Sequence, residues 1–493
     1  MSFKVLTEAD RKFFLLVADA TFCNPFSSRR QEIDRQIAGM VHEPDWSKVV
    51  PRAVGQIQQR LGQLDAEGCS KIQHFDAGDR ELMMYTYLFE GFHRLSDDFD
   101  KLIDRQRKRG DEPVKVGFAE AAIASLEVRG FTREQAVWVF AMYYQIRRAF
   151  RLIDTGLIGP SDCMRRLRMD LWNNIFTYDI RNYERYLWDR MEDFSTLLEG
   201  PTGCGKGAAA AAIGTSGFIA FDPDKGCFEN SFTRMLIDVN LAQFTPGLIE
   251  SELFGHAKGA FTGAVADYEG VFGRCARYST IFLDEISEIR TTLQVKLLRV
   301  LQERTYWPVG SHRRQTFRGR VIGATNQPVA QLLKTKRFRE DFYYRLCADC
   351  IPVPSLRQRI DENKNELADL VRHFITQIIG QADEELTGRV LEVIDTRLGP
   401  NYPWPGNVRE LAQCIRRVIL KRDYESDLAE RRKTGPVIEI GSLDQPIGAP
   451  QLLGEYCRAL MEKHNSLSHV ARLTGLDRRT VKKYAEQRIG NGQ

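Results

Sequence analysis

The sequence lacks long apolar runs. No stretch approaches the ~20 apolar residues that a membrane-spanning helix needs. Residues 1–10 also lack the apolar core of a secretory signal peptide. We therefore expect a cytoplasmic protein.

A cysteine framework is missing as well. The ten cysteines are scattered without regular spacing in a chain of 493 residues, which is too long to need disulfides, so we expect reduced thiols. Cys347 and Cys350 form one CxxC pair. A zinc or redox role would need a second pair or a thioredoxin-like context, and the sequence has neither. We expect residues 347–353 to form a buried strand instead.

Net charge is also low, at +4 for the whole chain. Residues 451–493 hold eight Lys/Arg against four Asp/Glu, so the remaining residues are balanced. Any nucleic-acid-binding surface is therefore expected at the C-terminus. The length and the 43% hydrophobic content predict three or four domains.

Hydrophobic periodicity divides the chain into five sections. Helical spacing, clearest in residues 136–150, predicts an all-α domain over residues 1–165. Short β-rich runs then alternate with helical stretches, which predicts an α/β domain with a parallel sheet over residues 166–356. A helical section (357–432), a Gly/Pro-punctuated linker (433–450) and a short basic helical module (451–493) follow. The predicted strands are residues 196–199, 235–239, 280–283, 321–324 and 349–353.

A glycine-rich loop follows the first of these strands and leads into a helix. Such a loop holds phosphates with backbone N–H groups and the helix N-terminus, while Lys206 reaches the β- and γ-oxygens of ATP. Gly207 is a departure, because the general motif has Ser or Thr there to ligate Mg²⁺. The binding of the magnesium ion would then depend more on the phosphates, on water and on the carboxylates at an acidic strand end. The loop residues are Gly200, Pro201, Thr202, Gly203, Cys204, Gly205, Lys206 and Gly207.

Two carboxylates end the apolar run 280–283. Asp284 would hold the magnesium ion, and Glu285 would polarise the water that attacks the terminal phosphate. An acidic pair can also simply cap a helix. The order of loop, acidic strand and further strands favours a nucleotide site.

The segment from residue 252 to residue 264 contains a glycine-hinged loop. An exposed aromatic residue between two glycines suits a segment that inserts into a partner and withdraws, whereas a surface turn would not need Phe261. The loop residues are Gly259, Ala260, Phe261, Thr262, Gly263 and Ala264. This block resembles the promoter-remodelling loop of the sigma-54-dependent enhancer-binding activators, a bacterial branch of the AAA+ ATPases.

The resemblance implies roles for two asparagines that follow predicted strands. Asn240 matches a switch residue that would hold Glu285 away from water until the γ-phosphate is sensed, and Asn326 matches a polar sensor beside that phosphate. Either residue could instead be a strand-end turn residue. Their positions at carboxyl ends of strands favour ligand contact.

The resemblance also implies three functional arginines. Arg339 and Arg345 match the stretch that supplies arginine fingers to a neighbouring subunit, so a monomer would be catalytically incomplete. Arg409 matches the lid sensor that points at the nucleotide, whereas Trp404 in the same motif is expected in the core. A second loop at residues 307–310, after an amphipathic helix over residues 293–302, would lie beside the first.

The C-terminal module has helix-turn-helix spacing, with a Gly475 turn and an Asp477 cap before the second helix. On that helix Val481 would pack inward. A solvated basic helix is the alternative to DNA binding. Similarity to the Fis-like ends of the activator family favours DNA binding, with base contacts from Arg478, Arg479 and Thr480 and phosphate contacts from Lys482 and Lys483.

Residues 1–165 would be the input domain. They contain no strand ending in Asp followed by a later strand ending in Lys, so a receiver domain is disfavoured. His42, His74, His93 and Cys69 are too dispersed for a metal site. Ligand binding, a protein partner and self-inhibitory packing on the ATPase all remain open.

Together with these features, the resemblance implies an ATP- and Mg²⁺-dependent transcription activator that binds upstream DNA as a dimer, assembles into a hexameric ring and acts on sigma-54 RNA polymerase. One alternative, motivated by Gly207, is a nucleotide-gated DNA-binding regulator with little hydrolysis. Another is a general AAA+ remodeller, which would not explain the C-terminal module or the glycine-hinged loop.

Overall fold

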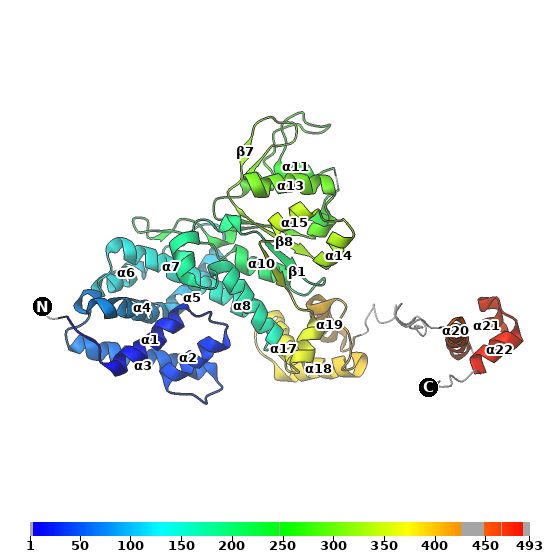
Figure 1. The fold of residues 1–493 in the computed structure, drawn as a ribbon, viewed down its shortest axis with the longest axis horizontal. Helices are drawn as coiled ribbons and strands as arrows, with labels where there is room; N and C mark the ends of the chain where they lie inside the picture. The colour runs from blue at the N-terminus through cyan, green and yellow to red at the C-terminus, as the bar shows by residue number, and fades with distance from the viewer. Residues whose placement is uncertain (1–2, 246, 425–447, 465, 487–493) are drawn as a thin grey trace. The chain divides into compact units, whose positions relative to one another are not determined.

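The computed structural model describes residues 3–245, 247–424, 448–464 and 466–486 (Figure 1). The chain forms two compact units, one of residues 1–391 with 402–416 and one of residues 392–401 with 417–493. None of the described helices is long and apolar enough to cross a membrane.

The first unit begins with a helical region. Side-chain caps define several of its helix starts. In α7, Thr132 and Gln135 form a reciprocal capping box, each side chain accepting from the other's backbone N–H. The helices are α1 (Glu8–Phe22), α2 (Ser28–Ala38), α3 (Trp46–Ala66), η1 (Ile72–His74), α4 (Ala77–Arg94), α5 (Ser96–Arg109), α6 (Ala119–Val128), α7 (Arg133–Gly156), α8 (Asp162–Phe176), α9 (Ile180–Asn182), η2 (Tyr183–Leu187) and η3 (Met191–Asp193).

A five-stranded parallel sheet follows, in the order β4-β5-β8-β1-β9. All five predicted strands form this sheet, and each end lies within one residue of its predicted position. The strands are β1 (Thr196–Glu199), β4 (Leu236–Asn240), β5 (Thr280–Asp284), β8 (Arg320–Thr325) and β9 (Asp349–Pro352). Two short antiparallel hairpins join β2 (Phe221–Asp222) to β3 (Cys227–Phe228) and β6 (Thr305–Tyr306) to β7 (Gln315–Thr316).

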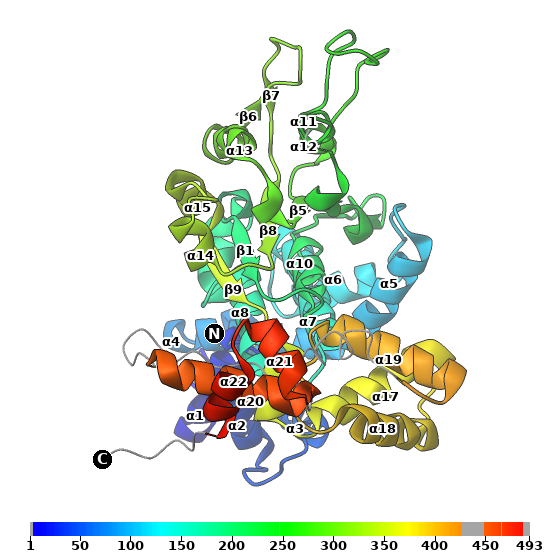
Figure 2. The same cartoon turned by 90° about the vertical axis from the view of Figure 1, so that its right-hand side faces the viewer.

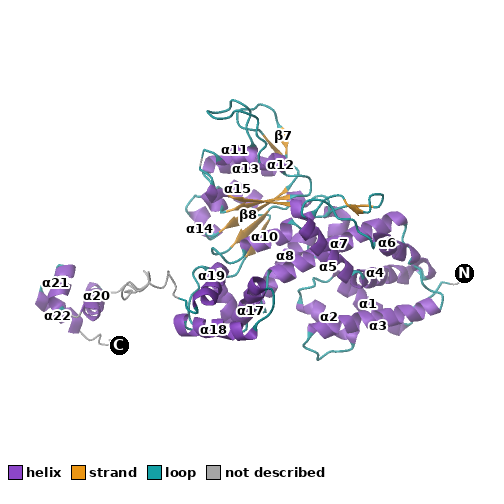
Figure 3. Cartoon of the chain, turned by 180° about the vertical axis from the view of Figure 1, so that it is seen from behind, coloured by secondary structure: helices purple, strands orange, loops and turns teal. Residues whose placement is uncertain are grey.

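Helices cover both faces of the sheet (Figure 3). The predicted helix over residues 293–302 is α13 (Thr291–Glu303), and its leucine face is buried, as expected. The remaining helices of this part are α10 (Lys206–Gly214), η4 (Phe232–Arg234), η5 (Leu241–Gln243), α11 (Ile249–Phe254), α12 (Val271–Arg274), η6 (Ile286–Glu288), α14 (Val329–Lys334) and α15 (Glu340–Leu346).

The sheet separates two hydrophobic cores, because successive strand residues point to opposite faces. Leu197, Ile281 and Leu283 pack into one core with α11, α13 and α15. Leu198 and Phe282 pack into the other, which continues without a break through α7 and α8 into the helical region. The predicted domain boundary after residue 165 is therefore wrong: it falls inside α8, and the helical region shares its core with the α/β part.

Buried polar contacts fasten α7 to the end of α10. Arg148 donates from Nε to the carbonyl of Thr215, the C-cap of α10, at 2.8 Å. Gln145 donates to the carbonyl of Ser216 at 2.9 Å and to the Tyr183 hydroxyl at 2.6 Å. A cation at a helix C-terminus interacts favourably with the helix dipole, so these contacts hold the helical region against the helix that follows the glycine-rich loop.

A helical lid completes the described part of the chain before residue 425. Its helices are α16 (Leu356–Glu362), α17 (Glu366–Ile379), α18 (Glu384–Leu398) and α19 (Asn407–Lys421). The lid is tied to the loop before α8 by Glu366, which is fully buried, pairs with Arg359 and accepts from the Ser161 N–H at 3.0 Å.

The C-terminal module contains α20 (Ala449–His464), α21 (Leu467–Thr474) and α22 (Arg478–Glu486), which pack on one another. Helix α20 includes the last two residues of the predicted linker, because Ala449 and Pro450 can occupy a first helical turn. Residues 433–447 of the predicted linker lie outside the described residues.

The CxxC segment forms β9, as predicted, but the predicted burial is wrong. Ile351 and Val353 are buried, whereas Cys350 is exposed, because β9 is an edge strand that pairs only with β1. All ten cysteines are free, and no group of three or more candidate ligand side chains that could hold a metal ion occurs among the described residues.

Candidate nucleotide site and partner loops

The glycine-rich loop connects β1 to α10 in a conformation that depends on its glycines. Gly203 and Gly205 have φ angles of 77° and 114°, which residues with a side chain rarely adopt. Lys206 is buried, and its Nζ donates to the carbonyls of Gly200 at 2.7 Å and Pro201 at 3.2 Å. The ammonium group is therefore held over the loop at the start of α10, where a phosphate would bind.

The acidic pair lies at the end of β5. Asp284 Oδ1 accepts from the Glu285 backbone N–H at 2.9 Å, and Glu285 itself has a φ of 56°. Burial, then the charge of Asp284, raises the pKa of Glu285, while Lys206 and Arg409 act in the opposite direction. Glu285 Oε2 is buried and has no hydrogen-bond partner in the described part of the chain. It is thus an acceptor available to a water molecule.

The two predicted asparagines meet this pair at the same edge of the sheet. Asn326 follows β8, and its Nδ2 lies 3.4 Å from Thr202 Oγ1 in the glycine-rich loop. Its Oδ1 is buried without a partner among the residues described. Asn240 ends β4 directly beside Asp284 in the strand register. Its Oδ1 caps η5 by accepting from Ala242 N–H at 3.0 Å, rather than contacting Glu285.

The lid packs on the glycine-rich loop through the first turn of α19. Asn407 Nδ2 donates to the carbonyl of Thr202 at 3.0 Å, and the Arg409 N–H donates to that of Gly203 at 3.3 Å. Arg409 therefore lies in the first turn of α19, with its backbone at the glycine-rich loop. Trp404 is buried, as expected. The contact of Asn407 with the loop is not predicted from the sequence. The only indication of it there is the position of Asn407 between Gly406 and Arg409.

We expect Gly203→Ala to weaken ATP binding by at least about tenfold, and Gly207→Ala to have little effect. A Cβ on Gly203 would lie 2.4 Å from the Gly406 carbonyl in a strained backbone conformation, whereas one on Gly207 meets nothing within 4 Å. A cost of about 1.4 kcal/mol corresponds to tenfold in affinity. Fluorescent-nucleotide titration measures both variants, and equal affinities would contradict the close packing of loop and lid.

The predicted arginine fingers lie away from this loop. Arg339 occupies the N-cap position of α15, and its partly exposed side chain pairs with Asp341 at 2.7 Å. Arg345 donates from Nε to the Leu301 carbonyl at 2.8 Å. Among the described contacts, neither side chain reaches residues 200–207 of its own chain. A role at the site would therefore require a second copy of the chain.

Two loops project side by side from this domain, one between α11 and α12 and the other between β6 and β7 (Figure 2). The N–H of Ala257 donates to the Val309 carbonyl, and the N–H of Val309 to the Gly255 carbonyl, each at 2.9 Å. A Cβ on Gly310 would lie 2.6 Å from Ala260 Cβ. The predicted second loop is thus fastened to the base of the glycine-hinged loop.

The tip of the glycine-hinged loop is a compact turn. Gly259 and Gly263 have φ angles of 81° and 104°, and the Gly259 N–H donates to the Ala264 carbonyl at 2.8 Å. Phe261 is 40% exposed, and its ring meets His256 edge-on with centroids 4.9 Å apart. Thr262 is exposed beside it. The predicted exposed aromatic tip is therefore present, with its ring in an edge-on contact with His256.

In the C-terminal module, Gly475 has a φ of 71° and turns the chain between α21 and α22. Asp477 caps α22 by accepting from the N–H groups of Arg479 at 2.9 Å and Thr480 at 3.0 Å. Val481 is fully buried, as predicted. The Thr480 hydroxyl donates to Asp477 at 2.5 Å, so it serves the cap. The side chains of Arg478, Arg479, Lys482 and Lys483 are exposed.

A glycine-rich loop after the first strand, an acidic strand end, asparagines at the ends of neighbouring strands and a helical lid together are the arrangement of an AAA+ domain. Residues 182–351 match the Sigma-54 interaction domain family, and residues 361–430 match the AAA+ ATPase lid domain family. The chain therefore contains a sigma-54 interaction domain followed by its lid, which confirms the predicted resemblance over these residues. The C-terminal helices lie outside both matches.

Curated relatives match the same part of the chain. The transcriptional regulatory protein ZraR of Salmonella typhimurium is 38% identical over 48% of this chain and 49% of its own length. The regulatory protein AtoC of Escherichia coli is 34% identical over 60% and 58%, and LuxO of Vibrio cholerae 40% over 46% and 39%. The chain thus spans about half the length of the curated relatives it matches.

Among solved structures, NtrX from Brucella abortus in complex with ATP is similar, at 22% identity and a TM-score of 0.41. The likeness covers 74% of this chain and 79% of that one.

Proposed function

We propose that this protein is an ATP-hydrolysing transcription activator that remodels sigma-54 RNA polymerase. The observation that carries the proposal is the position of the glycine-hinged loop in a sigma-54 interaction domain. It lies between α11 and α12, on the chain segment that joins Asn240 at the end of β4 to Asp284 at the end of β5. A structural change at the end of β4 or β5 can therefore reach the glycine-hinged loop along the two chain segments that connect the loop to these strands.

The residues at the strand ends fit a nucleotide and its metal ion. The buried, unpartnered oxygens of Glu285 and Asn326 suit an oriented water and a phosphate network. Asp284 would hold Mg²⁺, which when bound neutralises charge on the β- and γ-phosphates. Lys206 would bind the phosphates, and backbone N–H groups within residues 200–205 would donate hydrogen bonds to them. Arg409 would contact them from the lid.

Hydrolysis follows from what these residues can do. Glu285 would orient the attacking water, and Asn326 would sense the γ-phosphate. Asn240 would couple the loss of the γ-phosphate to the chain segment that leads to the glycine-hinged loop. Arg339 and Arg345 would act on the site of a neighbouring copy in a ring, because they do not reach the site of their own chain in the described contacts. An assembled homo-oligomer would then be the active form.

DNA binding is proposed for α22. Its exposed Arg478, Arg479, Lys482 and Lys483 form a basic surface on a helix that follows a short turn, which suits entry into a major groove. Thr480 contributes through its contact with Asp477, which fixes the start of the helix.

The test is Thr262→Ala, with Thr316→Ala as the control. Thr262 is exposed at the loop tip and touches no part of the nucleotide site, whereas Thr316 is exposed on β7 of the same domain. We expect the ATP turnover of Thr262→Ala to stay within about twofold of the wild-type value. Open-promoter formation should fall by at least about tenfold, because one or two contacts with the polymerase are lost. Normal promoter opening by Thr262→Ala would remove the loop from the contact.

A nucleotide-gated DNA-binding regulator with little hydrolysis is the second candidate. Gly207 favours it, because the position offers no side-chain ligand to Mg²⁺, and the space beside it is open. Turnover that is absent in the wild-type protein and appears in Gly207→Glu would support this candidate, since a Cβ at this position meets nothing within 4 Å.

A further inference from the structure

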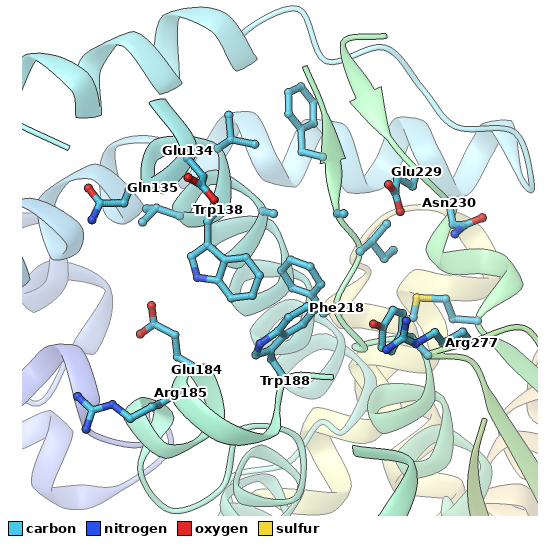
Figure 4. A pocket seen from close by; sticks show the side chains of 18 of the residues that line it. Glu134, Gln135, Trp138, Glu184, Arg185, Trp188, Phe218, Glu229, Asn230 and Arg277 are labelled. Carbon is cyan, nitrogen blue, oxygen red and sulfur yellow. The ribbon is translucent and has the colours of Figure 1, made fainter. Parts of the chain in front are cut away.

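A large cavity lies between the helical region and the ATPase part of the first unit (Figure 4). None of residues 200–207 of the glycine-rich loop lines it. Its volume is about 1260 Å³, which accommodates a ligand of more than one ring. Helices α4 and α7 and the α9–η2 turn line one side. Three ATPase segments, at residues 218–221, 229–235 and 274–279, line the other.

Aromatic rings from both sides meet in this cavity. The Trp138 ring on α7 lies 4.8 Å from that of Trp188, and both pack on Phe218, at 4.7 and 5.1 Å. Figure 4 shows these three side chains together at the centre of the cavity wall. Tyr278 continues the cluster at 6.3 Å from Trp188. Half-buried tryptophan and tyrosine rings offer large flat faces on which a planar ring can stack.

Positive charge gathers on the ATPase side of the cavity. That side is lined by three arginines, Arg234, Arg274 and Arg277, and by one carboxylate, Glu229. On the helical side, the lining arginines and glutamates are equal in number. Arg274 and Arg277 form no ion pair with a carboxylate among the described residues, and the Arg277 guanidinium lies over the Tyr278 ring at 4.6 Å. A guanidinium beside an aromatic platform suits a bound carboxylate or sulfonate.

We propose that this cavity binds a planar aromatic anion and that the ligand controls the ATPase. The rings would stack on the tryptophans, and the acidic group would pair with Arg274 and Arg277. Met235 and Ser279 also line the cavity, and each directly precedes a strand, β4 or β5, that ends in the nucleotide site. A ligand that joins the helical region to these two strand starts would restrain both strands. This control, unlike the binding itself, rests on the proposed ATPase function.

The binding test uses 2-naphthoate as the probe and the full chain as the protein. Fluorescence of the lining tryptophans reports occupancy without any need for ATP turnover. We expect saturable quenching at about 1 mM probe or below. The double variant Arg274→Gln/Arg277→Gln should weaken binding by at least about tenfold, because two charge-assisted hydrogen-bonding partners are lost. Both arginines are exposed, so the variant should fold.

The controls separate this site from adventitious binding. Arg190→Gln removes an exposed arginine that does not line the cavity and should bind the probe as the wild type does. Neutral 2-naphthamide should bind at least about tenfold more weakly than the acid. Absence of saturable binding, or equal binding by the amide or by the double variant, would overturn the proposal.

Control of the ATPase is measured separately. We expect ATP turnover of the wild type to change by at least about twofold at saturating 2-naphthoate and that of the double variant to stay constant. Binding with unchanged turnover would overturn the regulatory part. Absence of turnover in every sample would instead contradict the proposed function and leave the binding result standing.

Discussion

Glu285→Gln is expected to lower the turnover number for ATP hydrolysis by at least about 100-fold while ATP binding is retained. A positioned general base contributes roughly 10²–10⁴-fold, and glutamine keeps the shape of the side chain without the charge that polarises water. The buried, unpartnered Oε2 of Glu285 is the atom that the water would use. Loss of one negative charge beside Asp284 should favour the binding of a polyanionic nucleotide, because it lowers the repulsion between the site and the phosphates.

The control for this prediction is Glu288→Gln. Glu288 lies one turn further on, at the end of η6, and its carboxylate is half-exposed and 3.7 Å from Arg337. Steady-state turnover and nucleotide titration should give near wild-type values for this variant. A turnover number for Glu285→Gln equal to that of the wild type would exclude Glu285 as the base.

Arg339→Ala is expected to lower turnover by at least about 1,000-fold, because an arginine supplied in trans stabilises charge on the transferring phosphate. The Arg339 side chain can act on a neighbour, since the only partner described for its guanidinium is the nearby Asp341 on the protein surface. Wild-type turnover per subunit should accordingly rise with protein concentration. Arg318→Ala, which removes an exposed arginine before β8, is the matched control.

Mixing the two inactive variants tests the shared site directly. In a mixed ring, a subunit carrying Arg339→Ala keeps Glu285, and a neighbouring subunit carrying Glu285→Gln can supply Arg339 to it. Turnover should therefore reappear on mixing. Turnover that stays absent in the mixture, or that does not depend on concentration in the wild type, would place the arginine in its own subunit's site or outside catalysis.

The strands and the nucleotide loop could be predicted from the sequence because their signals are local. Each central strand is a short apolar run, and the polar residues Asp284, Asn240 and Asn326 follow strands directly, so a parallel sheet must bring them to one edge. The structure places all three there. The loop conformation likewise follows from the glycines at 203 and 205.

The attachment of the helical region could not be predicted, because an amphipathic pattern does not say what a helix face packs against. Arg148 and Gln145 look like solvent-facing residues in the sequence, yet both are fully buried at the end of α10. The contact between the two loops depends on Val309 and Ala257, which are far apart in sequence. The exposure of Cys350 depended on the edge position of β9, which no local pattern contains.

The most direct test of the account is open-complex formation by the wild-type protein with sigma-54 RNA polymerase at a sigma-54 promoter, measured as unpairing of the promoter DNA. With ATP and Mg²⁺ we expect the DNA to open, and with a non-hydrolysable ATP analogue it should stay closed, because opening depends on the hydrolysis step at Glu285. Opening with the analogue, or a closed promoter despite rapid ATP turnover, would contradict the coupling of hydrolysis to the glycine-hinged loop.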